Sequence, residues 1–158
     1  MIARLFMPLW LVVAAVTHAD DELDAAFDRD VLIIEANEFA CYRFDIYLAV
    51  KFDQQRRGLM HVRELPATTG MLFVYQDSDI HSMWMKNTYI PLDIAFARSD
   101  GTIVNIVQHT EPLSLRSIRS IEPVSYVLEL NAGVTDRLAI KAGSRLLWGP
   151  IFDQQAAN

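Results

Sequence analysis

Cysteine is almost absent from this sequence, because its 158 residues contain only Cys41. A single thiol cannot form an internal disulfide, and it has no second cysteine with which to build a Cys-x-x-Cys zinc site. Cys41 lies in the apolar stretch Phe39–Phe44, at the start of a predicted strand. This setting is typical of a buried thiol that packs as a small hydrophobic group, so we expect Cys41 to have a structural role.

Positive charge is also scarce. The chain has 14 lysines and arginines against 20 aspartates and glutamates, which gives a net charge of −6 at pH 7. Its largest basic cluster is Arg56-Arg57. Proteins that bind nucleic acid or an anionic membrane surface place many lysines and arginines against phosphate groups. The composition therefore argues against both kinds of partner.

Long apolar runs are missing except near the start of the chain, where Leu5–Val16 is interrupted only by Pro8. Arg4 precedes this run, and Thr17-His18-Ala19 follows it in the pattern that signal peptidase recognises. The alternative is a membrane anchor, but the run falls short of the roughly 20 residues that cross a bilayer. We therefore predict a signal peptide over residues 1–19 and an exported protein, either periplasmic or secreted.

The remaining chain has the length of one domain, for which ~100 to 200 residues are usual. Its acidic opening, Asp20–Asp24, predicts a solvated, flexible segment over residues 20–30. The domain itself is expected over residues 31–150, with a short tail over residues 151–158. We found no internal repeat, low-complexity tract or linker that would divide it.

Alternation of apolar and polar residues, the period of a strand with one buried face, recurs along this domain. It is clearest in Phe44–Val50, Leu92–Ala97 and Ser125–Asn131, while Met71–Tyr75 is continuously apolar and predicts a central strand. With Val31–Ile34 as the first strand, about seven or eight short strands are expected. The sequence therefore predicts a mainly β fold, an antiparallel sandwich or jelly-roll-like open barrel with one or two short helices.

Three connecting segments carry specific expectations. Asp53 is predicted to cap a short helix over residues 54–59, which Gly58 would end. Asp77–Asp79 is expected to turn the central strand into a hairpin with Ile80–Met85. The segment Glu111–Pro123 has no sustained period and is predicted to be a long loop, which could form the lid or the rim of a site.

Polar residues at the predicted strand ends form the main candidate site. Opposite charges and amides at neighbouring strand ends could hold a zwitterionic or hydroxyl-rich ligand. The alternative is a structural network in which Asp93 and Glu129 pair with Lys86 and Arg57. The candidate ligand-binding residues are Arg57, Lys86, Asn87, Asp93, Glu129 and Asn131.

Two other chemistries are open to this sequence. His81, Met83 and Met85 would project from one face of a single strand, where an imidazole and two thioethers could bind Cu(I), as in a periplasmic copper-binding module. Asp93 and Glu129 could act as the acid and base of a hydrolase if their environments differ. No Gly-x-Ser-x-Gly elbow occurs to support serine catalysis.

Five stretches of the sequence carry a family resemblance. They are Arg57–Met60, Gly70–Phe73, Trp84–Thr88, Pro91–Phe96 and Val127–Gly133. Together they resemble the DUF192 (UPF0127) family, over about residues 31–148. The resemblance implies a single, mainly β domain, common in exported bacterial proteins, with no activity established for the family. We therefore expect a monomeric, non-enzymatic module without a cofactor, which binds a small polar ligand or a cell-envelope partner.

Overall fold

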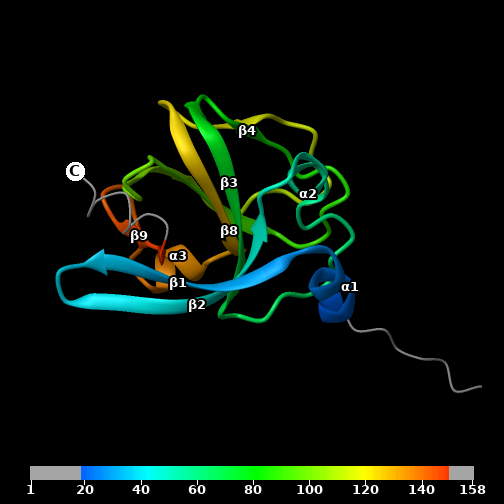
Figure 1. The fold of residues 1–158 in the computed structure, drawn as a ribbon, viewed down its shortest axis with the longest axis horizontal. Coiled ribbons are helices and arrows are strands. Elements are labelled where there is room, and N and C mark those ends of the chain that lie inside the picture. Colours follow the sequence, from blue (N-terminus) through cyan, green and yellow to red (C-terminus); the bar gives the residue numbers. More distant parts are fainter. Residues whose placement is uncertain (1–18, 150–158) are drawn as a thin grey trace, which may run out of the picture.

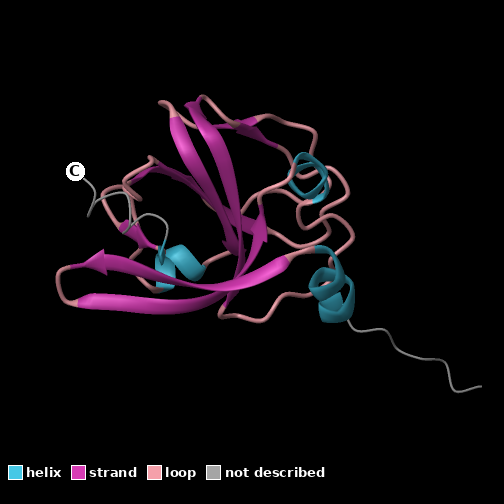
Figure 2. Cartoon of the chain, viewed as in Figure 1, coloured by secondary structure: helices cyan, strands magenta, loops and turns pink. Residues whose placement is uncertain are grey.

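The computed structural model describes residues 19–149, so the predicted tail over residues 151–158 and all but the last residue of the predicted signal peptide lie outside it. Seven strands form one sheet in the order β6-β5-β8-β3-β2-β1-β9. They are β1 (Asp28–Asn37), β2 (Ala40–Ala49), β3 (Thr69–Asp79), β5 (Leu92–Ala97), β6 (Ile103–Val107), β8 (Val124–Asn131) and β9 (Arg145–Leu147). Strands dominate the described chain (Figure 2), which confirms the prediction of a mainly β fold.

The sheet curls into a half-barrel whose two edges meet (Figure 1). Thr102, next to β6, forms an antiparallel bridge with Arg145 of β9. The N–H of Leu146 donates to the oxygen of Gly101, and the N–H of Ile103 donates to the oxygen of Ser144, both at 2.8 Å. These bonds pair backbone groups that an open edge would expose, so the open barrel of the prediction is closed along this short seam.

One strand pair departs from the antiparallel arrangement that we predicted. β2 and β3 run parallel, with Ile46 opposite Gly70 and Leu48 opposite Leu72. Parallel neighbours need a crossover connection, and residues 50–68 provide it with the help of α2 (Phe52–Arg57). β3 lies in the middle of the sheet order, as its continuous apolar sequence indicated.

Both faces of the sheet are covered. One apolar cluster contains side chains from all seven strands, including Leu128 and Leu130 of β8, and fills the inside of the curl. The other lies on the outer face and joins Val127 of β8 and Phe73 of β3 to Leu59 in the crossover. Side chains on alternate positions of β8 therefore enter two different cores.

The described residues contain three short helices, one more than predicted: α1 (Ala19–Ala26), α2 and α3 (Val134–Arg137). α1 occupies part of the segment that we expected to be solvated. Leu23 and Phe27, four residues apart and so on one face of the chain, are 1% and 4% exposed in the outer cluster. Two apolar side chains thus hold this acidic segment against the sheet, and our prediction is corrected there.

The start of α2 also differs from the prediction, because Asp53 is not its N-cap. The helix begins at Phe52, and the side chain of Gln54 caps the turn by accepting from the N–H groups of Lys51 (3.0 Å) and Val50 (3.2 Å). Gln54 Nε2 then donates to the oxygen of Ala26, which ties α2 to the end of α1. Gly58 does end the helix, with a φ of 46° that favours glycine.

The hairpin predicted over residues 77–85 does not form. β3 continues through the polar residues 77–79, and the short β4 (Ser82–Met83) pairs with β7 (Ile118–Arg119). The reason is that Asp79 still has a sheet partner, Val124 of β8, so the chain stays extended. The predicted rim segment, residues 111–123, therefore contains a short strand.

Cys41 is exposed, contrary to our expectation of a buried thiol. It lies near the turn between β1 and β2, which projects beyond the rest of the sheet (Figure 1). A strand residue at such a tip has no second layer to cover it, whatever the apolar character of its neighbours.

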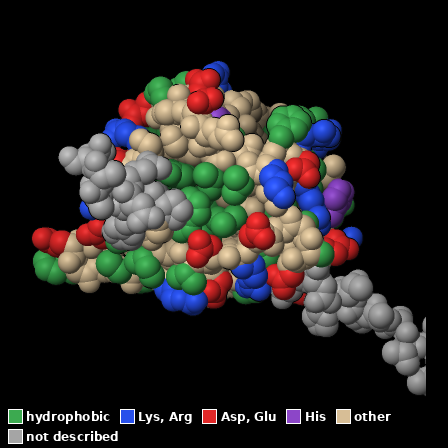
Figure 3. Space-filling view, in the orientation of Figure 1, with side chains coloured by type: hydrophobic (Ala, Val, Ile, Leu, Met, Phe, Trp, Pro, Cys, Tyr) green, Lys and Arg blue, Asp and Glu red, His purple; other side chains and the backbone are tan. Residues whose placement is uncertain are grey.

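The surface in Figure 3 carries lysine and arginine side chains next to aspartate and glutamate side chains, with an apolar area between them. Charge on this face is thus mixed rather than gathered into one broad field. Within residues 19–149, no helix has the length and apolar character needed to cross a membrane.

Candidate functional site

Glu129 is a buried carboxyl group on the central part of the sheet. It lies opposite Met71 of β3 and Ile94 of β5 in the strand register, so its side chain enters the outer apolar cluster. It is 4% exposed, and its Oε2 atom has no hydrogen-bond partner among residues 19–149. Burial without compensation disfavours the charged form and raises the pKa of Glu129 to about 8.

Glu129 is also part of the wall of a pocket with a volume of about 90 Å³. A single water needs roughly 10–15 Å³ by this kind of measure, so the pocket has room for several waters or one small functional group. Its walls come from the end of α2, from β3 and from the segment around β4. The other lining residues are Gln55, Arg56, Arg57, Gly58, Leu59, Met60, Phe73, Tyr75, Ser82, Met83, Trp84 and Thr88.

Tyr75 stands beside Glu129 in this wall. Burial, and next the charge of Glu129, raise the pKa of Tyr75 to about 12, so its hydroxyl stays neutral. That hydroxyl donates to Met83 Sδ at 3.7 Å. The ring of His81 stacks on the Tyr75 ring, with 3.5 Å between centroids. The wall next to Glu129 therefore includes an aromatic ring and a thioether.

Three cationic side chains belong to the pocket lining or lie next to it. Arg57 ends α2, with its guanidinium 3.9 Å from Glu22 Oε2 and 5.6 Å from the centroid of the Phe27 ring. The preceding Arg56 is exposed. Lys86 Nζ lies 5.1 Å from the centroid of the Trp84 ring, which itself lines the pocket. The lining therefore combines a buried carboxyl group, Glu129, with arginine side chains that are half-buried or exposed.

Of the six residues predicted to form a site, the structure places Arg57 and Glu129 in this one pocket. Lys86 is next to it through Trp84. Asn87, with a positive φ of 57°, accepts from the N–H of His61 through its backbone oxygen, so it shapes a turn. Asn131 donates to the oxygen of Leu65 at 2.7 Å and fixes the crossover loop.

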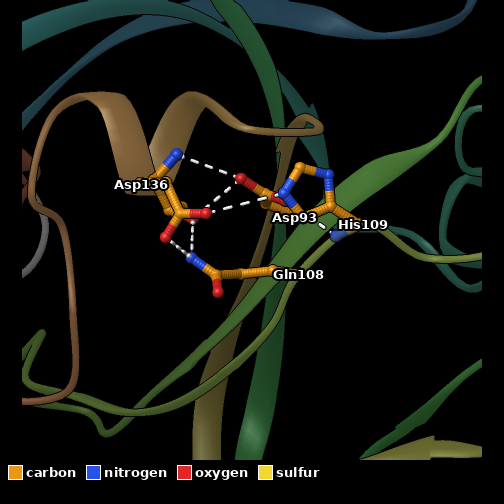
Figure 4. Close-up of polar contacts among 5 residues, drawn as sticks. Asp93, Gln108, His109 and Asp136 are labelled. Carbon is orange, nitrogen blue, oxygen red and sulfur yellow. Dashed lines mark hydrogen bonds and ion pairs between the residues drawn. The ribbon is translucent and has the colours of Figure 1, made fainter.

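Asp93 belongs to a different place. It lies opposite Leu130 in the register and therefore on the opposite face of the sheet from Glu129. Its Oδ1 accepts from the N–H of His109 (3.0 Å), and its Oδ2 accepts from the N–H (3.0 Å) and the hydroxyl (2.7 Å) of Thr135 (Figure 4). Gln108 extends this network by donating to Thr135 Oγ1 and Asp136 Oδ1.

The position of Asp93 corrects two of our predictions. Asp93 and Glu129 cannot act as an acid and base on one substrate, because the sheet separates their side chains. Nor do they form a structural network with Lys86 and Arg57, since the hydrogen-bond partners of Asp93 are backbone N–H groups and a hydroxyl. Strand alternation predicted correctly that each carboxyl group points away from the face occupied by the residues before and after it. It could not show that Asp93 and Glu129 would then lie on different faces of the sheet.

The copper site predicted from His81, Met83 and Met85 lacks its geometric basis. β4 ends at Met83, so no continuous strand carries the three side chains on one face. Met85 is buried in the core, where its Sδ accepts from the hydroxyl of Thr110 at 3.2 Å. Among residues 19–149, no group of three or more histidine, cysteine, aspartate or glutamate side chains is arranged to hold a metal ion.

Sequence reasoning missed most of the pocket walls, notably Tyr75, Phe73 and Gly58. Tyr75 closes a strand that we interpreted only as core, and Gly58 was noted only for ending a helix. A signal did exist, because four of the five stretches that carry the family resemblance contribute lining residues. Because these stretches all belong to the family pattern, the sequence alone could have suggested that they meet at one pocket.

Comparison with known proteins agrees with this architecture. A protein of Sinorhizobium meliloti 1021, provisionally named a transcription regulator, has a crystal structure that is similar at a TM-score of 0.77 and 40% identity, covering 78% of this chain and 96% of that chain. A protein of unknown function from Novosphingobium aromaticivorans DSM 12444 is similar at a TM-score of 0.75 and 31% identity, covering 78% of this chain and 88% of that chain. No curated protein matches significantly.

The family comparison covers the site itself. Residues 33–148 match the family described as Uncharacterized ACR, or DUF192. That range includes every residue that lines the Glu129 pocket and all strands except the first part of β1. The chain belongs to the DUF192 family.

Proposed function

We propose that this protein is a non-enzymatic module that binds a small polar ligand, one group of which enters the Glu129 pocket and hydrogen-bonds to the carboxyl group. The observation that carries the proposal is the buried Glu129 Oε2 without a partner among the described residues. Buried polar atoms in proteins are nearly always paired, and an exception needs an explanation. A ligand that donates a hydrogen bond to this oxygen would explain the exception.

The size of the pocket supports a ligand that is only partly enclosed. Sites that bury a whole drug-sized molecule usually measure roughly 300–1,000 Å³, whereas this pocket measures about 90 Å³. One functional group would therefore enter, and the rest of the ligand would lie across the surface near Arg56 and Arg57. A cell-envelope molecule with a protruding polar group would meet this requirement as well as a free small molecule.

Binding rather than catalysis is favoured by the surroundings of Glu129. The carboxylate that could have assisted it in hydrolysis, Asp93, is on the other face of the sheet. Tyr75, with a pKa of about 12, is a weak base and nucleophile at neutral pH because it keeps its proton. The groups nearest Glu129 are suited to contact a ligand rather than to move its protons.

A ligand screen by thermal unfolding tests the proposal. Amino acids, sugars, nucleotides and cell-wall fragments would be added to the wild-type protein, to Glu129→Gln and to a control, Glu38→Gln, whose exposed side chain lies in the β1–β2 turn. A specific ligand at a hundredfold excess over Kd stabilises the fold by about 2.7 kcal/mol. We expect at least one such ligand to raise the Tm of the wild type and the control but not of Glu129→Gln. Equal stabilisation of all three proteins, or no stabilising ligand at all, would contradict the proposal.

We also propose that the protein is exported. The support is Arg4, the apolar run Leu5–Val16 and the small residue Ala19, which together have the form of a signal peptide. Mass spectrometry of the protein from its native cells should find an N-terminus at Asp20. Recovery of intact Met1 in the membrane fraction would instead indicate an anchored protein.

A further inference from the structure

We propose that the ligand of the Glu129 pocket is a small zwitterion, with a primary ammonium group that enters the pocket and an anionic group that faces Arg56 and Arg57. This inference rests on the proposed function and specifies the chemical class of the ligand. It follows from the difference between the buried, inner part of the lining, where Glu129 is 4% exposed, and the outer part, where Arg56 is exposed and Arg57 half-buried.

The inner end suits a cation. Glu129 is its one carboxyl group, and the aromatic rings of Phe73 and Tyr75 line the same pocket, with His81 stacked on the ring of Tyr75. Aromatic rings attract cations through their negative faces, and the attraction strengthens when the cation leaves water. The thioethers of Met60 and Met83 add polarizable surface without adding positive charge. An ammonium group would thus find both a hydrogen-bond acceptor and favourable walls.

The outer end suits an anion. Arg56 and Arg57 are adjacent at the end of α2, and both contribute to the pocket lining. The interactions of Arg57 with α1 are long: 3.9 Å to the carboxylate of Glu22 and 3.4 Å to its backbone oxygen. The side chains of Arg57 and Glu22 are 39% and 69% exposed, so solvent screens this pair and little energy opposes a change of partner. Two guanidinium groups can bind a carboxylate or phosphate with several charge-assisted hydrogen bonds.

The small volume of the pocket limits the ligand. Both ends belong to one pocket of about 90 Å³, so the ammonium and the anionic group must be only a few bonds apart. α-Amino acids and aminoalkyl phosphates have this form. An aminoalkyl phosphate can be free in solution or can be the headgroup of phosphatidylethanolamine, and the two sources share the chemistry that the pocket would recognise.

Binding of an ammonium group should be coupled to the proton on Glu129. With a pKa of about 8, the free carboxyl group is mostly protonated at pH 7. A bound ammonium favours the ionised form, so binding below pH 8 releases up to one proton. The affinity should then rise by up to tenfold per pH unit between about pH 6 and 8. A neutral hydroxyl ligand would not require this proton release.

Isothermal titration calorimetry with defined probes tests the inference. The probes are O-phosphoethanolamine and glycine as zwitterions, ethanolamine as the amine alone, and inorganic phosphate as the anion alone. We expect at least one zwitterion to bind wild type at least tenfold more tightly than either half. Glu129→Gln should reduce its affinity to that of phosphate, Arg57→Gln should reduce it to that of ethanolamine, and Glu38→Gln should leave it unchanged.

A second readout does not depend on any variant. Titrations of wild type at pH 7 in buffers of different ionisation enthalpy should report the release of nearly one proton for the zwitterion. Sedimentation with vesicles identifies the source, using phosphatidylethanolamine mixed with phosphatidylcholine against phosphatidylcholine alone, whose quaternary ammonium has no N–H to donate. Binding to the mixed vesicles would assign the lipid headgroup, and binding to the soluble probe alone would assign a free molecule.

The results also separate this inference from the proposed function. Binding of a neutral sugar that depends on Glu129 would overturn the zwitterion and leave the ligand-binding module intact. A zwitterion that binds no more tightly than ethanolamine, or without release of a proton, would overturn the inference as well. If neither the vesicles nor any soluble probe binds, and no ligand in the thermal screen depends on Glu129, both proposals are wrong.

Discussion

Two buried carboxyl groups, Glu129 and Asp93, have opposite environments although they lie on neighbouring strands. Asp93 accepts three hydrogen bonds, two of them from Thr135. Glu129 has a buried oxygen without a partner among residues 19–149. Hydrogen bonds to a carboxylate stabilise its charged form, whereas burial alone opposes it. The same residue chemistry therefore gives a structural group on one face of the sheet and a candidate binding group on the other.

The raised pKa of Glu129 predicts how stability depends on pH. Between about pH 4.5 and 8 the folded protein keeps the Glu129 proton, while the unfolded chain has lost it. The folded state then binds more protons, so stability falls as the pH rises through this range and stops falling above about 8. Each pH unit costs up to about 1.4 kcal/mol, or about 5 kcal/mol at most over the whole range.

The measurement is urea unfolding of wild type and Glu129→Gln at steps from pH 4.5 to 9. The difference between the two free energies of unfolding should change in favour of the variant as the pH rises to 8 and then stay constant. A difference that is independent of pH would show that Glu129 is ionised in the folded protein throughout.

Asp93→Asn should lower stability without affecting the Glu129 pocket. An amide has one acceptor oxygen, so its NH₂ group must face either the N–H of His109 or the two donors of Thr135. At least one buried donor then loses its partner, which costs about 2 to 3 kcal/mol. Chemical unfolding of this variant beside Asp53→Asn, an exposed position expected to change by less than about 0.5 kcal/mol, measures the effect. Unchanged stability would show that the network of Asp93 contributes nothing to folding.

At the scale of elements, the pocket depends on how closely β3 approaches β8. Gly70 of β3 lies opposite Leu130, and a Cβ at this glycine would be 2.7 Å from the backbone oxygen of Glu129 and 2.7 Å from Leu130 Cδ2. No other residue type fits there without moving the strand that carries Glu129. The glycine therefore contributes to the position of the carboxyl group as well as to packing.

Gly70→Ala should accordingly destabilise the fold by about 3 kcal/mol, because the backbone oxygen that it meets cannot move aside as a flexible side chain would. The matched control is Gly149→Ala, where an added Cβ meets nothing within 4 Å. Thermal unfolding of both variants checks the prediction. If Gly70→Ala has the same Tm as the wild type and the control, β3 and β8 can move apart without loss of stability.

At the scale of the whole molecule, the curled sheet produces two cores, and the pocket belongs to the outer one. α1, the crossover after β2 and the segment around β4 cover the outer face, and the last two of these form the pocket walls around Glu129. The inner core, closed by the seam between residues 101–103 and β9, is filled by side chains from all seven strands. The site lies where loops and short elements pack against the outer face of the curled sheet.

The sequence alone was sufficient for the local structure. Strand alternation in Leu92–Ala97 and Ser125–Asn131, the continuous apolar run in β3 and the break at Gly58 depend on neighbouring residues, and each was predicted correctly. The motif stretches likewise indicated the family. These features follow from local backbone preference and from the period of burial, and both depend only on residues that are adjacent in the sequence.

Only the tertiary structure decided which of these elements meet. The parallel pairing of β2 and β3, the burial of α1 and the partner of β4 depend on contacts between segments far apart in the sequence. The same holds for Asp93 and Glu129: a period of two shows that a side chain leaves its neighbours' face, but in a sheet covered on both sides it does not show which core that side chain enters. Strand order and register supply that information, and they separate Asp93, held by Thr135, from Glu129, which faces the pocket.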